Sequence, residues 1–354
     1  MLTDALQALL SDHFHGPVTL AAEPARVTGG FWASIHGFSI ASSPGDLPPG
    51  WTGPLVLRVM PDRSRAERES IVQRAVAATG FPSPAVLLAG YDESLGGAFM
   101  VMPFAAGKSP LSGLGRGSLL RVPRLLRQLP VQLAEIAVRL HRVDPAPVAA
   151  ALADGGYSAS GNGVEPRLAV IRAAAGTHSR GFDRLLDWFA DHRPDQPTLV
   201  VCHGDIHPFN LLVDSDGRVT VLDWTNGDLM PREYDIGFSA GLLRCAPFSV
   251  PKLARPVFDR LTSRLADRFV SVYERSFPVD PAMLAFFEAL QYARCLAEVA
   301  TARSGLTNIV DDRHPFEISA AAMTRRLAAL TGITVILPDA TPTEARLRNH
   351  EPPA

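Results

Sequence analysis

The sequence predicts an α+β protein with a small β-rich N-terminal lobe and a larger, mainly helical C-terminal lobe. Up to about residue 103, short apolar and β-branched runs alternate with glycine and proline turns around a single helical pattern. Beyond this point, long stretches carry apolar residues at helical spacing, and one island of strand pattern interrupts them at 198–222. We therefore expect two lobes, 1–103 and 104–338, and a disordered polar tail, 339–354.

The N-terminal lobe is expected to be a sheet of short strands with one helix. Its strand candidates are a strand–turn–strand unit at 26–34 and further strands at 54–60, 85–91 and 98–102. Asp62 has the side chain of an N-cap residue, and the helix that follows should end before Gly80. Residues 103–107 form a short connector with proline and glycine, which suits a boundary between lobes.

The second lobe combines helices with a hairpin. Residues 124–143 have helical spacing, and 153–164 read as a glycine- and serine-rich loop. Within the strand island, 198–202 should form one strand, while 211–213 and 219–222 should form a hairpin around Asp216 and Gly217. Helical patterns resume from about 235 to 330.

Composition excludes several classes of protein. The 354 residues are 47% hydrophobic and 20% charged with a formal net charge of −2, so no basic field indicates a nucleic-acid partner. We find no apolar run long enough to span a membrane and no signal-peptide pattern at the start, which predicts a cytoplasmic protein without a membrane partner. The three cysteines lack metal or disulfide spacing, so buried, reduced thiols are expected.

The strand island carries the most informative segment, His203-Gly204-Asp205-Ile206-His207-Pro208-Phe209-Asn210. Phosphoryl transfer from ATP needs a carboxylate that positions the acceptor hydroxyl and takes its proton, and oxygen ligands that hold Mg²⁺ on the phosphates. In protein kinases a catalytic Asp precedes a metal-binding Asn by five positions, and a second Asp follows a hairpin. Asp205 and Asn210 have this interval, and Asp223 follows the expected hairpin.

This pattern, H-G-D-x-x-x-x-N followed by D-W, resembles the aminoglycoside phosphotransferase and choline kinase family, which is related to protein kinases. Further similar segments are 140–144, whose sequence is L-H-R-V-D, and 227–235 after the hairpin. The resemblance covers roughly residues 25–245 and implies a protein-kinase-like bilobed fold. It also implies an ATP- and Mg²⁺-dependent kinase that phosphorylates a hydroxyl group of a small molecule.

The resemblance assigns roles to individual residues. Asp205 would be the catalytic base, Asn210 and Asp223 the magnesium ligands, and His203 a brace of the catalytic loop. Asp235 would tie this loop to the following helix. The hinge backbone from Met102 to Phe104 would bind adenine, although the sequence does not decide between ATP and GTP.

Two features depart from the family pattern, the residue at position 58 and the phosphate loop. Arg58 stands where the family has its ATP-binding lysine, and the only lysines of the chain, Lys108 and Lys252, are badly placed for that role. Arg58 could neutralise the α- and β-phosphates and pair with Glu69, because a guanidinium is always charged and binds carboxylates bidentately.

The phosphate loop is reduced to Gly29 and Gly30, with Ser34 near the expected polar position. The two glycines could also be a simple hairpin turn.

Other residues have alternative interpretations. Glu69 could be a solvated charge on an arginine-rich helix rather than the partner of Arg58. His207 is expected to be structural or close to the substrate rather than a metal ligand, because no partner stands at ligand spacing. His141 should be packed at a helix end, and Trp224 should lie in the core.

Three hypotheses for the activity remain. A small-molecule O-kinase is favoured; a catalytically quiet nucleotide-binding protein is the alternative that Arg58 and the short glycine loop suggest. A protein kinase is disfavoured, because little room remains after Asp223 for an activation segment. Residues 236–330 hold nine acidic and twelve basic residues, which gives no general support for a polycationic acceptor. The acceptor and the oligomeric state stay open.

Overall fold

The computed structural model of the protein describes residues 2–27, 33–112, 122–158, 164–176, 179–194, 198–251, 253–305 and 315–339. The chain divides into two compact units, each built from several segments. The first unit comprises Met1–Ser118, Arg142–Ala159 and His203–Leu229, and the second comprises Leu119–His141, Ser160–Cys202 and Met230–Ala354. The boundary expected at residue 103 stays a prediction, and the tail from residue 340 onward lies outside the described residues.

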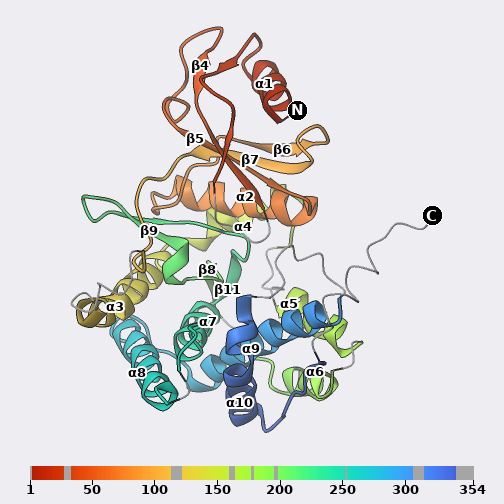
Figure 1. Ribbon diagram of the computed structural model, residues 1–354, viewed down its shortest axis with the longest axis vertical. Coiled ribbons are helices and arrows are strands. Elements are labelled where there is room, and N and C mark those ends of the chain that lie inside the picture. Colours follow the sequence, from red (N-terminus) through yellow and green to blue (C-terminus); the bar gives the residue numbers. More distant parts are fainter. Residues whose placement is uncertain are drawn as a thin grey trace. The chain divides into compact units, whose positions relative to one another are not determined.

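The first unit contains a five-stranded antiparallel sheet in the order β2-β3-β5-β7-β6. Its strands are β2 (Ala25–Arg26), β3 (Ser34–Phe38), β5 (Leu55–Met60), β6 (Leu88–Asp92) and β7 (Gly97–Pro103). A small sheet pairs β1 (Thr19–Leu20) with β4 (Ile40–Ser42), and the helices are α1 (Leu2–His13), α2 (Arg63–Ala78) and α4 (Pro145–Asp154). Figure 1 shows α1 and α2 on opposite sides of this sheet.

The central strand β5 explains this layering. Its residues Leu55, Leu57 and Val59 pack with Leu6 and Leu10 of α1 in one apolar cluster. Since side chains alternate along a strand, Val56, Arg58 and Met60 face the side that α2 covers. The face of β5 towards α2 therefore carries a charged residue that needs a partner.

The predicted helix after Asp62 is confirmed as α2, and Asp62 is its N-cap, accepting a hydrogen bond from the Arg65 N–H at 3.1 Å. The predicted hairpin is also confirmed: β9 (Leu211–Val213) pairs with β10 (Val219–Val221). It is preceded by a short 3₁₀ turn, η1 (Pro208–Asn210). The sequence patterns did not indicate α1, the β1–β4 pair or β11 (Asp228–Pro231).

The second unit is mainly helical, as predicted. Its helices are α3 (Val122–Leu140), α5 (Val164–Ala175), α6 (Phe182–Asp191), α7 (Arg232–Arg244), α8 (Arg255–Tyr273), α9 (Pro281–Arg303), η2 (Pro315–Ser319) and α10 (Ala320–Thr331). The strand β8 (Leu199–Cys202) pairs with β11. Helix α9 is the centre of the apolar core, because it packs against α5, α7 and α10 and is buried along most of its length.

Gly97 lies where the sheet leaves no room for a side chain. It begins β7 with a φ of +154°, and a Cβ at this position would lie against the backbone carbonyl oxygen of Met60, closer than real Cβ atoms come. We expect Gly97→Ala to lower the free energy of unfolding by about 1–3 kcal/mol, because both the backbone conformation and the close approach exclude a side chain. Urea denaturation measures this loss.

Gly45→Ala is the matched control, since Gly45 has no neighbour within 4 Å of its Cβ position. A Gly97→Ala protein as stable as the Gly45→Ala protein would contradict the predicted strain.

Candidate active site

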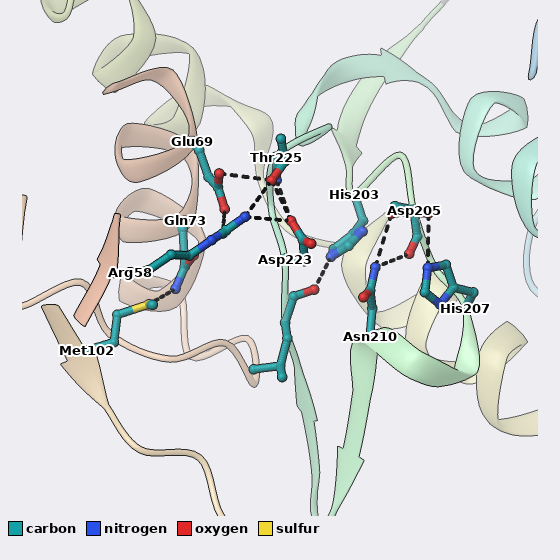
Figure 2. Close-up of polar contacts among 11 residues, drawn as sticks. Arg58, Glu69, Gln73, Met102, His203, Asp205, His207, Asn210, Asp223 and Thr225 are labelled. Atoms are coloured by element: carbon teal, nitrogen blue, oxygen red, sulfur yellow. Dashed lines mark hydrogen bonds and ion pairs between the residues drawn. The ribbon is translucent and has the colours of Figure 1, made fainter. Parts of the chain in front are cut away.

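The site is organised around Arg58 of β5, which is only 7% exposed. Its Nη1 donates to Oε1 of Glu69, and its Nη2 donates to Oδ1 of Asp223 at 3.2 Å and to Oγ1 of Thr225 at 3.0 Å. Figure 2 shows this guanidinium between α2 and the segment after the hairpin. The predicted pairing of Arg58 with Glu69 is present, and Arg58 also contacts the predicted metal ligand Asp223.

Glu69 lies on the buried face of α2 and is 2% exposed, so the interpretation as a solvated surface charge is wrong. Burial raises the pKa of Glu69, with a contribution from the nearby charge of Asp223, although Arg58 stabilises the charged form. Gln73, one turn later, was not predicted to contribute. Its Nε2 donates to the Pro84 carbonyl at 2.8 Å and to the sulfur of Met102 at 3.0 Å.

The hairpin brings Asp223 back to the catalytic loop. Val221 pairs with Leu211, and the Leu222 N–H donates to the Asn210 carbonyl at 2.8 Å. Asp223 has a φ of +64°, an uncommon left-handed conformation for a residue with a side chain. Burial opposes its charge, but Arg58 and Thr225 outweigh burial and lower the pKa of Asp223. Its side chain is still 37% exposed and can reach a ligand.

Asp205 and Asn210, five residues apart, are in direct contact. The Asn210 Nδ2 donates to the Asp205 backbone carbonyl at 3.0 Å and to its Oδ2 at 3.2 Å. The amide nitrogen of Asn210 thus fixes the loop, and its amide oxygen points elsewhere and can serve as a ligand. Ser109 secures the same loop, since its hydroxyl donates to the Pro208 carbonyl at 2.8 Å.

His207 contacts the other oxygen of Asp205. Its Nε2 lies 3.3 Å from Asp205 Oδ1, and its Nδ1 accepts from the Phe209 N–H at 3.2 Å. The role expected of His207, structural or close to the substrate, stays a prediction. Phe209, which the sequence analysis did not single out, is 58% exposed, and its ring centroid lies 6.1 Å from that of His207.

The supporting residues are buried. His203 is 0% exposed, and its Nε2 donates to the Leu222 carbonyl at 2.9 Å, so it braces the strand end before Asp223. Trp224 is fully buried against Phe81, as predicted.

In the second unit, the buried Asp235 contacts Nε2 of His141 at 3.1 Å. His141 is packed at the end of α3, as expected. The expected tie between Asp235 and the catalytic loop stays a prediction.

The predicted nucleotide residues have mixed outcomes. Gly29 and Gly30 lie outside the described residues, and Ser34 begins β3 opposite Val59. The Phe104 N–H donates to the Pro54 carbonyl at 2.9 Å, so this amide is already used within the sheet and does not offer adenine the expected donor. Met102 pairs with Val56 of β5. Along an antiparallel ladder every second residue points its N–H and C=O at the same neighbouring strand. Because Met102 lies two residues before Phe104, its backbone groups also point towards β5.

The charges of the site favour a divalent cation. Three carboxylates, those of Glu69, Asp223 and Asp205, face one guanidinium and the imidazole of His207, and the side chains of Asp205 and Asp223 are 22% and 37% exposed. Carboxylate and amide oxygens are the donors that Mg²⁺ prefers. Asp223 and Asn210 therefore fit a magnesium ion, and Asp205 on the same loop fits a general base.

Comparison with known proteins defines the class of protein. A family model described as the phosphotransferase enzyme family matches residues 50–287. A crystal structure of a putative aminoglycoside phosphotransferase from Ralstonia eutropha JMP134 superposes with a TM-score of 0.59 at 20% identity, covering 93% of this chain and 95% of that one. Aminoglycoside phosphotransferase APH(4)-Ia, in a ternary complex with AMP-PNP and hygromycin B, gives 0.53 at 16% identity, covering 93% and 98%. The fold is thus that of protein-kinase-like phosphotransferases.

The chain belongs to the phosphotransferase enzyme family, because the family model matches well over half of it. The match extends further towards the C-terminus than the expected 25–245.

A curated relative, mouse acyl-CoA dehydrogenase family member 10, is 27% identical over 230 residues, which is 62% of this chain. The match spans only 20% of that longer protein. Within the described part of the chain, no helix is both long and apolar enough to span a membrane.

The pair of His207 and Asp205 should make stability depend on pH. Burial opposes the charge of His207, but the carboxylates of Asp205 and Asp223 outweigh burial and raise its pKa. A raised histidine pKa stabilises the folded protein below the unfolded value near 6.5 and loses this contribution as pH rises through the folded value. We expect the advantage of the wild type over His207→Gln in thermal melts to shrink as pH rises above about 6.5.

Asp205→Asn is the control, because it removes the partner of His207 and should flatten the same pH dependence. Parallel melting profiles of the wild type and His207→Gln from pH 5 to 9 would count against the ion pair.

Proposed function

We propose that this protein is a small-molecule kinase that transfers the γ-phosphoryl group of ATP, with Mg²⁺, to a hydroxyl group of its acceptor. The observation that carries the proposal is the geometry of the catalytic loop: Asn210 holds Asp205, and the hairpin returns Asp223 beside Asn210. The structure of APH(4)-Ia with AMP-PNP, an ATP analogue, supports the choice of nucleotide. The assay below also tests GTP as the phosphoryl donor.

Asp205 would act on the acceptor hydroxyl. Its oxygens accept from Asn210 and His207, and an ionised carboxylate has about four acceptor sites, so it can also accept the acceptor O–H. The acceptor oxygen bonds to the γ-phosphorus while the bond from that phosphorus to the bridging oxygen of ADP breaks. Asp205 takes the hydroxyl proton, and ADP leaves with the electron pair of the broken bond.

Asp223 and Asn210 would hold Mg²⁺, which neutralises the negative charge of the phosphates when it is bound. Arg58 would add positive charge beside the α- and β-phosphates. Its bonds to Glu69, Asp223 and Thr225 use three of the five N–H donors of a guanidinium. Adenine would be bound by hinge groups that the sheet does not use, at Pro103 and Ala105 rather than at Phe104.

The acceptor is proposed to be a hydroxylated molecule without many positive charges. Acidic residues of the second unit form ion pairs with arginines of the same unit: Asp259 with Arg255, Asp267 and Glu288 with Arg244, Glu298 with Arg294 and Glu317 with Arg303. Such paired carboxylates offer little attraction to a polycation. The exposed ring of Phe209 near His207 instead offers an apolar surface close to the base.

Release of ADP from Mg-ATP tests the function across aminoglycosides, macrolides, choline-like alcohols, sugars and homoserine, with Mg-GTP as the second nucleotide. We expect one acceptor class to stimulate ADP release in the wild type. Asp205→Asn should reduce the stimulated rate by about 10²–10⁴-fold, because it removes the base, while Mg-ATP binding stays near the wild-type affinity.

Asp216→Asn is the matched control, since Asp216 is an exposed carboxylate at the hairpin turn of the same unit. Stimulated ADP release that survives Asp205→Asn would refute the assigned base. Nucleotide binding without stimulation by any acceptor would favour the catalytically quiet nucleotide-binding protein. The absence of nucleotide binding would contradict both this alternative and the kinase.

A further inference from the structure

Thr225 lies at the meeting point of the charged groups of the site. Its Oγ1 accepts from Arg58 Nη2 at 3.0 Å, lies 3.0 Å from Glu69 Oε2, and makes a short contact of 2.5 Å with Asp223 Oδ1. Figure 2 shows the hydroxyl between the carboxylates of α2 and of the segment after the hairpin. The four groups belong to the same compact unit.

The hydroxyl of Thr225 has one proton and two carboxylates within reach. Since a hydroxyl donates a single hydrogen bond, it can serve Glu69 or Asp223 at one time, while its lone pairs accept from Arg58. Both carboxylate oxygens lie within hydrogen-bond distance of it, Asp223 Oδ1 nearer than Glu69 Oε2.

The same contacts fix Asp223 in its uncommon backbone conformation. The left-handed φ of +64° persists only where the surroundings hold it. Besides the hydroxyl contact, the Thr225 N–H lies 3.4 Å from Asp223 Oδ1, and Arg58 Nη2 contacts the same oxygen. All of these donors meet Oδ1, so the carboxylate is held by one oxygen, and Figure 2 shows its other oxygen on the side away from Arg58.

We propose that Thr225 is a positioning residue for Asp223: its hydroxyl and its backbone N–H hold Oδ1, so that the metal-binding carboxylate presents Oδ2 to a cation. The inference rests on the proposed function in one respect, the role of Asp223 as a magnesium ligand. Arg58 holds the same oxygen of Asp223 and is itself held by Glu69. Loss of the Thr225 hydroxyl would therefore leave Arg58 in place and loosen the carboxylate of Asp223 alone.

The test measures how strongly Mg²⁺ promotes binding of a fluorescent ATP analogue to the full-length protein. Thr225→Val keeps the shape of the side chain and removes the hydroxyl, whereas Thr225→Ser keeps the hydroxyl. We expect Thr225→Val to raise the Mg²⁺ concentration for half-maximal binding about tenfold or more, as the loss of a hydrogen bond to a charged group implies. Thr225→Ser should stay within about threefold of the wild type.

A merely structural role would give a different pattern. It would lower the melting temperature of Thr225→Val and weaken nucleotide binding equally with and without Mg²⁺. This pattern, or a Thr225→Val protein with the wild-type dependence on Mg²⁺, would overturn the inference and leave the kinase proposal standing. A wild type whose nucleotide binding ignores Mg²⁺ would overturn the role of Asp223 and this inference with it. If Thr225→Val does not fold, Thr225→Ala against Thr225→Ser gives the same comparison.

Discussion

A buried guanidinium in the middle of a β-sheet cannot be stable alone, and Arg58 occupies such a position on β5. Removing an ion from water costs several kcal/mol, roughly, unless partners and hydrogen bonds compensate. Helix α2 supplies Glu69, and the segment after the hairpin supplies Asp223 and Thr225. The need to compensate one charge therefore links the sheet, the helix and the hairpin of the first unit at a single point.

The contacts of Arg58 show what an arginine can do at this position that the lysine expected there could not. An ammonium group is a compact charge, whereas the planar guanidinium presents five donors in a fixed arrangement. Arg58 uses this arrangement to contact three side chains at once. Arg68 of the same helix reinforces the connection, since it forms an ion pair with Asp228 and donates to the Gly227 carbonyl at 2.7 Å. Helix α2 is thereby held to the segment that carries Asp223 at two neighbouring positions.

The catalytic loop follows a different principle, because short-range hydrogen bonds set its geometry. Asn210 holds Asp205 across five residues, His207 holds the second carboxylate oxygen, and His203 braces the returning strand. Such local bonds can be encoded by spacing within one segment. Family membership defines the class of reaction, but of the seven described acidic residues between 236 and 330, five pair with arginines. Recognition of the acceptor thus depends on surfaces that the family motif does not specify.

By itself, the sequence determined the fold class, the helix after Asp62, the hairpin, and the five-residue interval across which Asn210 reaches Asp205, because periodicity and spacing act over a few residues. It could not decide whether Glu69 was buried or solvated, since arginines flank it and only the packing of α2 on β5 excludes water. Nor could it show that Phe104 uses its amide within the sheet, which depends on the register of β5 with β7. The link of Thr225 to Glu69 and Arg58 became visible only in the tertiary structure, because these partners are 156 and 167 residues away, and no local pattern records a contact of that range.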